Sequence, residues 1–264
     1  MRAVLENIVN IIKMANISNK AIQMPASAIR KLVPLADAAK KQGTKVYHLN
    51  IGQPDIKSPK CALDAIKNFS LENVSYSHSA GLMELRKGLV EKYYKKIGID
   101  ITVDELIVTV AGSESVNLAL EIACNPGDEV IVLEPFYTNY NTFAFMNGLT
   151  LKAIPTDIRN GFQIPPIEEF EKAITDKTKA ILVCNPGNPT GTQYSKESML
   201  ALGEIARKHD LFLLSDEVYR EFCYTDEPHF SAMNIPGLEQ NVILIDSVSK
   251  RYNLCGARVG CIVS

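Results

Sequence analysis

Hydrophobic and polar positions alternate in blocks along most of this chain. From about residue 106, short runs of apolar and β-branched residues are separated by longer stretches in which apolar residues recur every three or four positions. The short runs predict strands and the longer stretches predict helices. The predicted strands are residues 106–110, 129–133, 150–154, 180–184, 211–214, 242–245 and 257–263. The helices predicted between them are residues 115–123, 138–145, 166–173 and 196–209.

Strands as apolar as these are typical of sheets that are covered by helices on both faces and are mostly parallel. The pattern therefore predicts an α/β fold, a three-layer αβα sandwich around a mostly parallel seven-stranded sheet. In such sheets, ligands bind at the carboxyl ends of the strands. The polar residues that follow the strands are therefore where we expect the chemistry.

The pattern before residue 106 is mostly helical. Residues 27–42 form an amphipathic stretch, residues 47–51 are a short extended run, and helical patterns follow at 60–68 and 81–96. The chain start lacks the continuous apolar segment of a secretory signal, and no apolar run approaches the length needed to span a membrane. We therefore expect a cytoplasmic protein.

Composition and charge mainly exclude classes of function. The 264 residues are 46% hydrophobic and 22% charged, which is typical of a soluble globular protein. The net charge of -2 provides no positive potential that would attract nucleic acid or an anionic membrane. The six cysteines form no C-x-x-C pair, and the four histidines are far apart. We therefore expect free thiols in a reducing compartment and no metal site.

Two of the predicted strands are followed by features that suit a flat, phosphorylated ligand. The small-residue turn 111–115 opens a helix, so its free N–H groups could bind a phosphate, although an ordinary serine-capped helix would look the same. Tyr137 follows the next strand. Its ring could stack on a planar ligand or pack within a loop.

Three further strands end in groups that can bind or react. The loop 185–191 contains two Asn-Pro steps and two glycines, which fix a rigid turn and aim an amide side chain. Asp216 ends an apolar strand and needs a cationic partner, either a ligand nitrogen or a buried arginine. Lys250, flanked by hydroxyl groups, is either an activated amine or an exposed loop lysine. One ligand would use all five features: a phosphorylated, protonated pyridine aldehyde.

The combination resembles the fold-type I pyridoxal-5′-phosphate (PLP) enzymes, specifically the class I/II aminotransferases of the aspartate aminotransferase type. The resemblance runs from about Pro25 to Ser264. It rests on three motifs that occur in the family's order: Asn185-Pro-x-Asn188-Pro-Thr-Gly191, Ser215-Asp216-Glu217-Val218-Tyr219, and Ser247-x-Ser249-Lys250-x-x-Asn253-Leu254-x-Gly256-x-Arg258-Val259-Gly260.

The resemblance implies roles for individual residues. Lys250 would form a Schiff base with PLP and move a proton between the substrate Cα and the cofactor C4′. Asp216 would keep the pyridine nitrogen protonated, so that the ring accepts electrons. Tyr219 and Asn188 would bond the cofactor's phenolic oxygen, and Tyr137 would stack on the ring. Lys250, Asp216 and Tyr219 are the catalytic residues expected on this basis.

The same resemblance implies how the phosphate and the substrate are bound. Four residues would hold the cofactor phosphate: Gly112, Ser113, Ser247 and Arg258. Tyr76 resembles the tyrosine that reaches the phosphate of a neighbouring subunit, which implies a homodimer with shared sites. Gly52 and Asn188 would contact the substrate near its carboxylate.

The implied reaction is transfer of an amino group from an L-amino acid to a 2-oxo acid by a ping-pong mechanism in amino acid metabolism. Aspartate with 2-oxoglutarate is the leading substrate pair. The same cofactor residues also occur in carbon–sulfur lyases, in aminocyclopropanecarboxylate-synthase-like enzymes and in decarboxylases, and the fold also occurs as a non-catalytic PLP-binding domain. These alternatives stay open at the level of the sequence.

The resemblance also implies a division into domains. Residues 1–55 would be an N-terminal arm and part of a small domain, and residues 56–264 would be the large PLP-binding domain. Family members continue into a C-terminal small domain whose arginine clamps the substrate α-carboxylate, and no arginine follows Arg258 here. We therefore expect a truncated chain in which the C-terminal small domain is absent.

Overall fold

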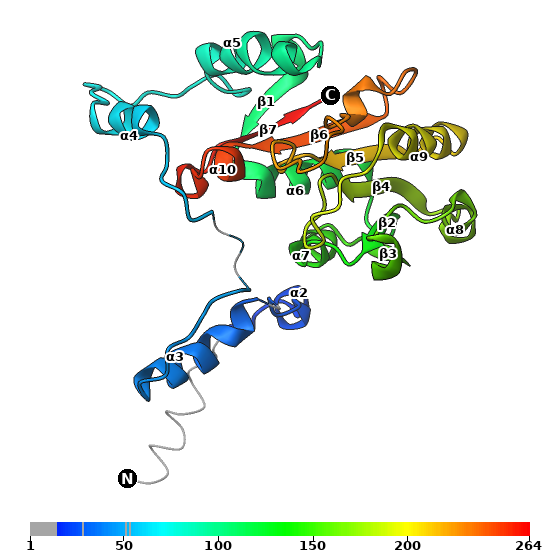
Figure 1. Ribbon diagram of the computed structural model, residues 1–264, viewed down its shortest axis with the longest axis horizontal. Helices are drawn as coiled ribbons and strands as arrows, with labels where there is room; N and C mark the ends of the chain where they lie inside the picture. Colours follow the sequence, from blue (N-terminus) through cyan, green and yellow to red (C-terminus); the bar gives the residue numbers. More distant parts are fainter. Residues whose placement is uncertain (1–14, 28, 51, 53) are drawn as a thin grey trace.

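The computed structural model describes residues 15–27, 29–50, 52 and 54–264 (Figure 1). Seven strands form one sheet in the order β1-β7-β6-β5-β4-β2-β3. Strands β2 to β6 are parallel to one another, whereas β7 runs antiparallel to both β6 and β1. The α/β fold with a mostly parallel seven-stranded sheet is therefore confirmed. The strands are β1 (Leu106–Thr109), β2 (Glu129–Glu134), β3 (Thr150–Pro155), β4 (Thr178–Cys184), β5 (Phe212–Asp216), β6 (Val242–Ser247) and β7 (Gly260–Val263).

Helices cover both faces of this sheet. Helices α6 (Ala111–Ala123) and α7 (Asn139–Met146) pack on one face. Helices α8 (Ile167–Ala173) and α9 (Lys196–Lys208) pack on the other, next to the segment of α5 (Met83–Lys92). The shorter elements of the sandwich are η2 (Tyr94–Ile97), η3 (Val103–Glu105), η4 (Ile158–Asn160), η5 (Ala232–Asn234), α10 (Val248–Arg251) and η6 (Cys255–Ala257).

The buried strand β6 shows how the two faces are separated. All six of its residues are buried. Ile243 and Ile245 belong to the cluster under α6 and α7, whereas Val242 and Leu244 belong to the clusters on the α5 and α9 face. Successive side chains of a strand point to opposite faces. The same alternation carries the adjacent polar residues at the carboxyl end of β6 to opposite faces of the sheet.

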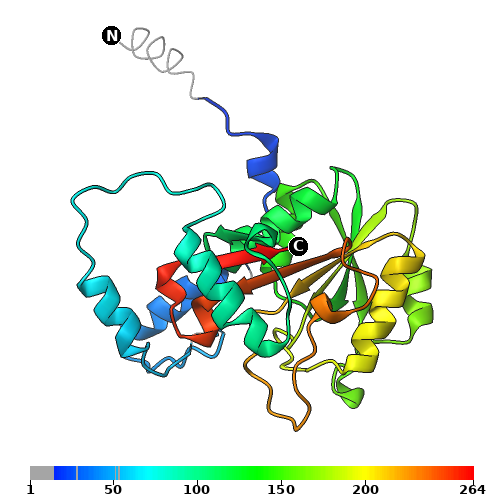
Figure 2. The ribbon, with the colours of Figure 1, turned by 90° about the horizontal axis from the view of Figure 1, so that it is seen from above.

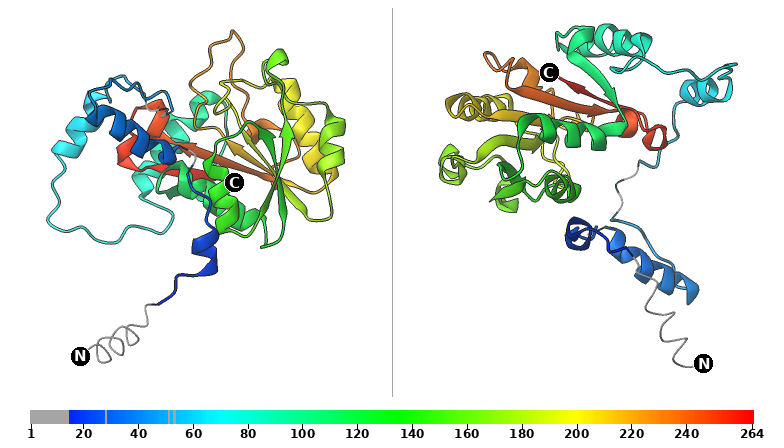
Figure 3. Two further views of the ribbon diagram at one scale, coloured as in Figure 1. Left: turned by 90° about the horizontal axis from the view of Figure 1, so that it is seen from below. Right: turned by 180° about the vertical axis from the view of Figure 1, so that it is seen from behind.

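The segment before residue 81 differs from the sandwich. It contains α2 (Asn19–Gln23), η1 (Arg30–Leu32), α3 (Val33–Lys41) and α4 (Lys60–Lys67). No described residue between 15 and 80 is buried. Figures 2 and 3 show the long loop between α4 and α5 standing out from the sandwich. The predicted extended run at 47–51 makes no β-pairing over residues 47–50, and residue 51 lies outside the described residues.

Three of the element boundaries that differ from the prediction lie beside the polar strand ends. Helix α6 begins at Ala111, so the small-residue turn is the first turn of the helix itself. Strand β6 extends to Ser247 because β7 pairs with its last residues. Strand β7 begins at Gly260 rather than at residue 257, because a 3-10 turn and the left-handed Arg258 precede it. None of the described helices is both long enough and apolar enough to cross a membrane.

The proposed boundary at residue 55 stays a prediction. The first 14 residues of the expected N-terminal arm lie outside the described residues.

Candidate active site

Asp216 is a buried carboxylate at the carboxyl end of β5. Its exposure is 5%, and its carboxylate accepts hydrogen bonds from the Tyr140 hydroxyl at 2.7 Å and the Val218 N–H at 3.3 Å. Burial raises its pKa to about 6, although the Tyr140 hydrogen bond opposes the rise. Arg220, the buried arginine nearby, forms its ion pairs with Glu217 and Asp246 instead. Within the described residues, Asp216 has no cationic partner within 4 Å, and a cationic ligand nitrogen would supply one.

The loop after β4 places Asn188 beside Tyr219. The Asn188 amide nitrogen donates to the Tyr219 hydroxyl at 3.4 Å, and burial raises the pKa of Tyr219. The loop is held by a hydrogen bond from Gly187 N–H to the Thr192 carbonyl at 2.8 Å. A Cβ at Gly187 would lie 2.6 Å from the Thr190 Oγ1, so glycine permits this close turn. The loop after β4 and the segment after β5 therefore place an amide and a phenol side by side.

Two tyrosines at the start of α7 form one wall of this region. Tyr137 is partly buried, and its hydroxyl accepts a hydrogen bond from the Asn139 amide at 2.7 Å. The ring of Tyr140 meets that of Tyr137 edge-on at 5.4 Å between centroids. Sequence reasoning missed Tyr140 as the partner of Asp216. The signal available was its spacing of three residues from Tyr137, which puts both on one side of the helix start.

The first turn of α6 lies against the carboxyl end of β6. A Cβ built on Gly112 would lie 3.7 Å from the Ser247 Cβ, and Ser113 is the next, partly buried residue. A Cβ built on Gly260 would lie 2.6 Å from the carbonyl carbon of Ala111, a contact that only glycine permits. Ala111 itself has a φ of 60°. Free N–H groups at a helix start, next to a serine hydroxyl, suit a phosphate.

Arg258, two residues before Gly260, has a strained backbone conformation. Its φ is 55°, and its guanidinium donates to the Cys255 carbonyl at 2.9 Å. Asn253 also has a positive φ, of 46°. Positive φ values cost free energy in residues other than glycine and gather at functional sites. The strain in this short segment therefore favours a function over a plain connection.

Lys250 lies in the short helix α10, whose first turn is capped by Ser247. The Ser247 hydroxyl accepts the Ser249 N–H at 3.1 Å, and the Lys250 amine donates to the Gly52 carbonyl at 3.1 Å. The structure thus brings Gly52, from the N-terminal segment, to Lys250. Tyr76 is different, because it lies fully exposed in the loop between α4 and α5.

The arrangement fits the pyridoxal phosphate expected from the resemblance. A buried carboxylate without a counter-cation suits the pyridinium nitrogen, and a helix start beside a serine and an arginine suits the phosphate. A half-buried lysine could reach the aldehyde. The residues that the structure gathers at these strand ends are Gly52, Gly112, Ser113, Tyr137, Asn188, Asp216, Tyr219, Ser247, Lys250 and Arg258.

Comparisons with known proteins agree with this arrangement. The sequence profile of the family "Aminotransferase class I and II" matches residues 44–264. The chain is 36% identical over 247 residues to a putative aminotransferase YugH of Bacillus subtilis, which covers 92% of this chain and 62% of that protein. It is 32% identical over 249 residues to an aspartate aminotransferase of Thermotoga maritima, which covers 94% of this chain and 66% of that protein.

Solved structures show the same similarity. The crystal structure of the Thermotoga maritima aspartate aminotransferase has a TM-score of 0.87 and 32% identity, and the match covers 94% of this chain and 66% of that one. The Thermus thermophilus aspartate aminotransferase with maleate has a TM-score of 0.85 and 32% identity over 95% of this chain and 65% of that one. This chain therefore spans slightly less than two thirds of the length of these relatives.

Proposed function

The chain belongs to the class I and II aminotransferase family, and from this premise we propose that it binds pyridoxal 5′-phosphate and moves an amino group from an L-amino acid to a 2-oxo acid. The observation that carries the proposal is Asp216, a carboxylate buried at a strand end without a cationic partner among the described residues. A protonated ring nitrogen is the partner that this carboxylate lacks.

When bound, the cofactor supplies an aldehyde that takes up the amino group and a ring that accepts electrons from the substrate Cα. Asp216 would keep the ring nitrogen protonated. This role suits a buried carboxylate whose burial costs free energy unless a cation pairs with it. Tyr140 orients that carboxylate through the 2.7 Å hydrogen bond. Asn188 and Tyr219, which lie in contact with each other, bond the phenolic oxygen of the ring.

Lys250 would hold the cofactor through its amine, and the same amine would serve as the base that moves a proton at the substrate Cα. Tyr137 would pack against the ring. The phosphate is held by the first turn of α6, with Gly112 and Ser113, together with Ser247 and Arg258.

The names of the relatives support a proposal for the substrate, and Tyr76 supports one for the assembly. Gly52 contacts the Lys250 amine, so a substrate bound at Lys250 lies beside the Gly52 carbonyl, with Asn188 near its carboxylate. Aspartate with 2-oxoglutarate is the proposed pair, supported by relatives named aspartate aminotransferases, and the cycle is ping-pong. We also propose a cytoplasmic homodimer in which the exposed Tyr76 of each subunit reaches the phosphate of the other.

The test is the absorption spectrum of the purified chain with added pyridoxal phosphate, before and after L-aspartate or L-glutamate. We expect a visible band that Lys250→Ala lacks and that the amino acid shifts. The matched control is Lys208→Ala, which removes a surface lysine paired with Glu171 and should leave the band unchanged.

The outcomes separate the two parts of the proposal. Absence of any Lys250-dependent band would contradict cofactor binding by this chain. A Lys250-dependent band that ignores amino acids would keep the cofactor site and contradict aminotransferase activity in the chain as it stands. With L-cysteine in place of these amino acids, release of pyruvate, ammonia and sulfide without amino transfer would assign the site to a carbon–sulfur lyase.

A further inference from the structure

A buried row of ionic side chains lies behind the proposed cofactor site, on the opposite face of the same strand ends. We call Glu217, Arg220, Asp246 and Arg251 the ion chain. The Glu217 carboxylate lies 3.3 Å from the Arg220 guanidinium, which lies 3.7 Å from the Asp246 carboxylate. Asp246 in turn accepts a 2.5 Å hydrogen bond from Arg251. The two acids and two bases balance in charge.

The ion chain is closed off from solvent. Its side chains are between 0% and 6% exposed. The guanidinium of Arg251 lies 3.8 Å from the centre of the Tyr93 ring, and the Tyr94 hydroxyl donates to Asp246 at 2.8 Å. The ion chain is therefore enclosed by the α5–η2 segment and has no open side at which a ligand could bind.

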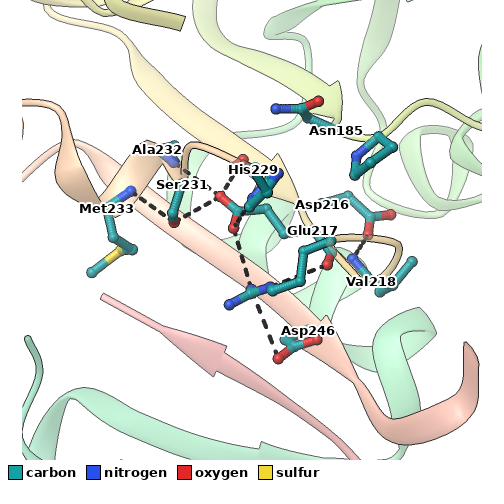
Figure 4. Close-up of polar contacts among 12 residues, drawn as sticks. Asn185, Asp216, Glu217, Val218, His229, Ser231, Ala232, Met233 and Asp246 are labelled. Carbon is teal, nitrogen blue, oxygen red and sulfur yellow. Dashed lines mark hydrogen bonds and ion pairs between the residues drawn. The ribbon is translucent and has the colours of Figure 1, made fainter. Parts of the chain in front are cut away.

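Each end of the ion chain is attached to a different part of the fold. At one end, Glu217 accepts hydrogen bonds from the Ser231 hydroxyl at 2.9 Å and the Ala232 N–H at 3.0 Å, and it contacts the His229 ring nitrogen at 2.9 Å (Figure 4). At the other end, Arg251 is the last residue of α10. The row thus joins the loop after β5 to the turn after β6.

Sequence adjacency connects the ion chain to the proposed site. Glu217 directly follows Asp216, and Arg251 directly follows Lys250. Figure 4 shows Asp216 and Glu217 turned away from each other at the end of β5. Asp216 and Lys250, the two residues proposed to act on the cofactor, are therefore each the sequence neighbour of a residue at one end of the ion chain.

Stability alone does not account for this arrangement. Among the described residues, Arg220 Nη1 and Nη2 and Arg251 Nε have no hydrogen-bond partner. Buried ionic groups that are incompletely hydrogen-bonded commonly stabilise a fold less than apolar side chains of similar volume would. A helix as short as α10, with four residues, also cannot hold itself in place. A role in fixing geometry accounts for both facts.

We propose that the ion chain is a positioning device, which fixes the turn carrying Lys250 relative to the strand end carrying Asp216. This inference rests on the proposed function in one respect, namely that Lys250 and Asp216 are the residues that act on the cofactor. The members of the ion chain are positioning residues, because they touch neither the cofactor region nor the substrate region and act through their neighbours.

Amide hydrogen exchange in the cofactor-free full chain tests the coupling directly. In Arg251→Met, we expect the Ala232 amide, which is bonded to Glu217 at the far end, to exchange about tenfold faster than in the unchanged protein. The matched control is Arg86→Met, because Arg86 is a buried arginine of α5 at 3% exposure that bonds the Leu106 carbonyl. This variant should change the exchange rate of the Ala232 amide by no more than about twofold.

A variant at the other end of the ion chain shows whether the effect of Arg251→Met reflects coupling rather than misfolding of that one variant. In Glu217→Gln, we expect faster exchange at the Tyr252 and Leu254 amides, which bond carbonyls of α10 at 3.2 Å and 3.1 Å. Coupling between two sites must act in both directions. Arg251→Lys, which keeps the charge, should restore most of the protection at Ala232.

Cofactor binding gives the second readout. Arg251→Met and Glu217→Gln should each weaken the binding of pyridoxal phosphate about tenfold, and the double variant should weaken it about tenfold rather than a hundredfold, because either break disconnects the same row. Additive effects would contradict a continuous row.

The exchange measurement also separates this inference from the proposed function. Unchanged exchange at Ala232 in Arg251→Met, or equal acceleration in Arg86→Met, would overturn the inference whether or not the protein binds the cofactor. If exchange is coupled as expected but no Lys250-dependent band forms, the ion chain stands as a device that fixes the turn and strand end, and the proposed function fails.

Discussion

Two neighbouring carboxylates on opposite faces of the sheet have different partners and opposite pKa shifts. Asp216 and Glu217 follow each other in the chain and are both buried. On the face under α6 and α7, Asp216 has a tyrosine and a backbone N–H as partners, and burial raises its pKa to about 6. On the other face, burial would also raise the pKa of Glu217, but Arg220 and His229 lower it below its ordinary value.

The difference separates two uses of a buried charge. A carboxylate that is paired with arginine or histidine side chains of the protein helps to hold the folded structure. A carboxylate without a cationic partner costs folding free energy unless a bound ligand supplies the cation. The alternation of side chains along β5 and β6 allows one strand end to hold both kinds within a residue of each other. The comparison predicts opposite signs for the same amide substitution at these two positions.

The largest expected effect is from Glu217→Gln. It removes the nearer of the two carboxylates paired with the buried Arg220 and leaves Asp246 at 3.7 Å, so we expect the free energy of unfolding at pH 7 to fall by about 3–5 kcal/mol. Because the folded pKa is lowered, the contribution of Glu217 is present above the ordinary glutamate pKa and is lost as the pH falls. Urea titration at pH 7 and pH 4 would measure both. Glu221→Gln, at an exposed position, is the control, and an equal loss there would remove the contrast.

The next effect has the opposite sign. Asp216→Asn should raise the free energy of unfolding of the cofactor-free protein by about 3 kcal/mol at pH 7. The folded pKa of about 6 lies above the ordinary 3.8, so the ionised aspartate costs stability as the pH rises from about 4 to 6, and the full cost is present above that. The gain should therefore vanish at pH 3.5. Thermal or urea unfolding across this range measures it, and a loss of stability at pH 7 would contradict the interpretation of Asp216.

The smallest expected effect is from Tyr140→Phe, which tests the hydrogen bond between Tyr140 and Asp216. Tyr140→Phe removes the hydroxyl that lowers the pKa of Asp216. We expect the unfolding free energy at pH 7 to fall by about 1–2 kcal/mol, because a hydrogen bond to a charged group is lost. The pH at which stability stops falling should also move above about 6. Tyr194→Phe is the control, because Tyr194 is also buried and its hydroxyl makes no hydrogen bond to Asp216 within the described residues. No movement of the inflection in Tyr140→Phe would contradict the assigned partner.

Much of this architecture could be predicted from the sequence. Apolar runs such as 242–245 gave the strands, and the polar clusters after them gave the residues that the structure gathers at one edge of the sheet. Local patterns carry this information because burial on both faces leaves few alternatives to apolar residues. The predicted start of α6 and end of β6 were wrong, because the end of β6 pairs with β7 and the first turn of α6 packs closely against Gly260 of β7.

The partners of the charges could not be predicted in this way. Nothing in the local sequence distinguishes Asp216, which bonds Tyr140, from Glu217, which pairs with Arg220. The Tyr94 hydroxyl reaches Asp246 from a segment far away in the chain. Such contacts are set by which elements the folded sheet brings together, and sequence spacing carries no record of them.

The antiparallel strand β7 has a consequence for how the protein is made. In the described sheet, β1 has β7 as its single neighbour, with Leu106 paired to Val263. At ribosomal speeds, roughly ten to thirty seconds pass between synthesis of the two strands. During that interval β1 stays unpaired, and the first turn of α6 lacks the Gly260 contact that presses it into place. The proposed phosphate site can thus be completed only after β7 has been synthesised and has paired with β1 and β6.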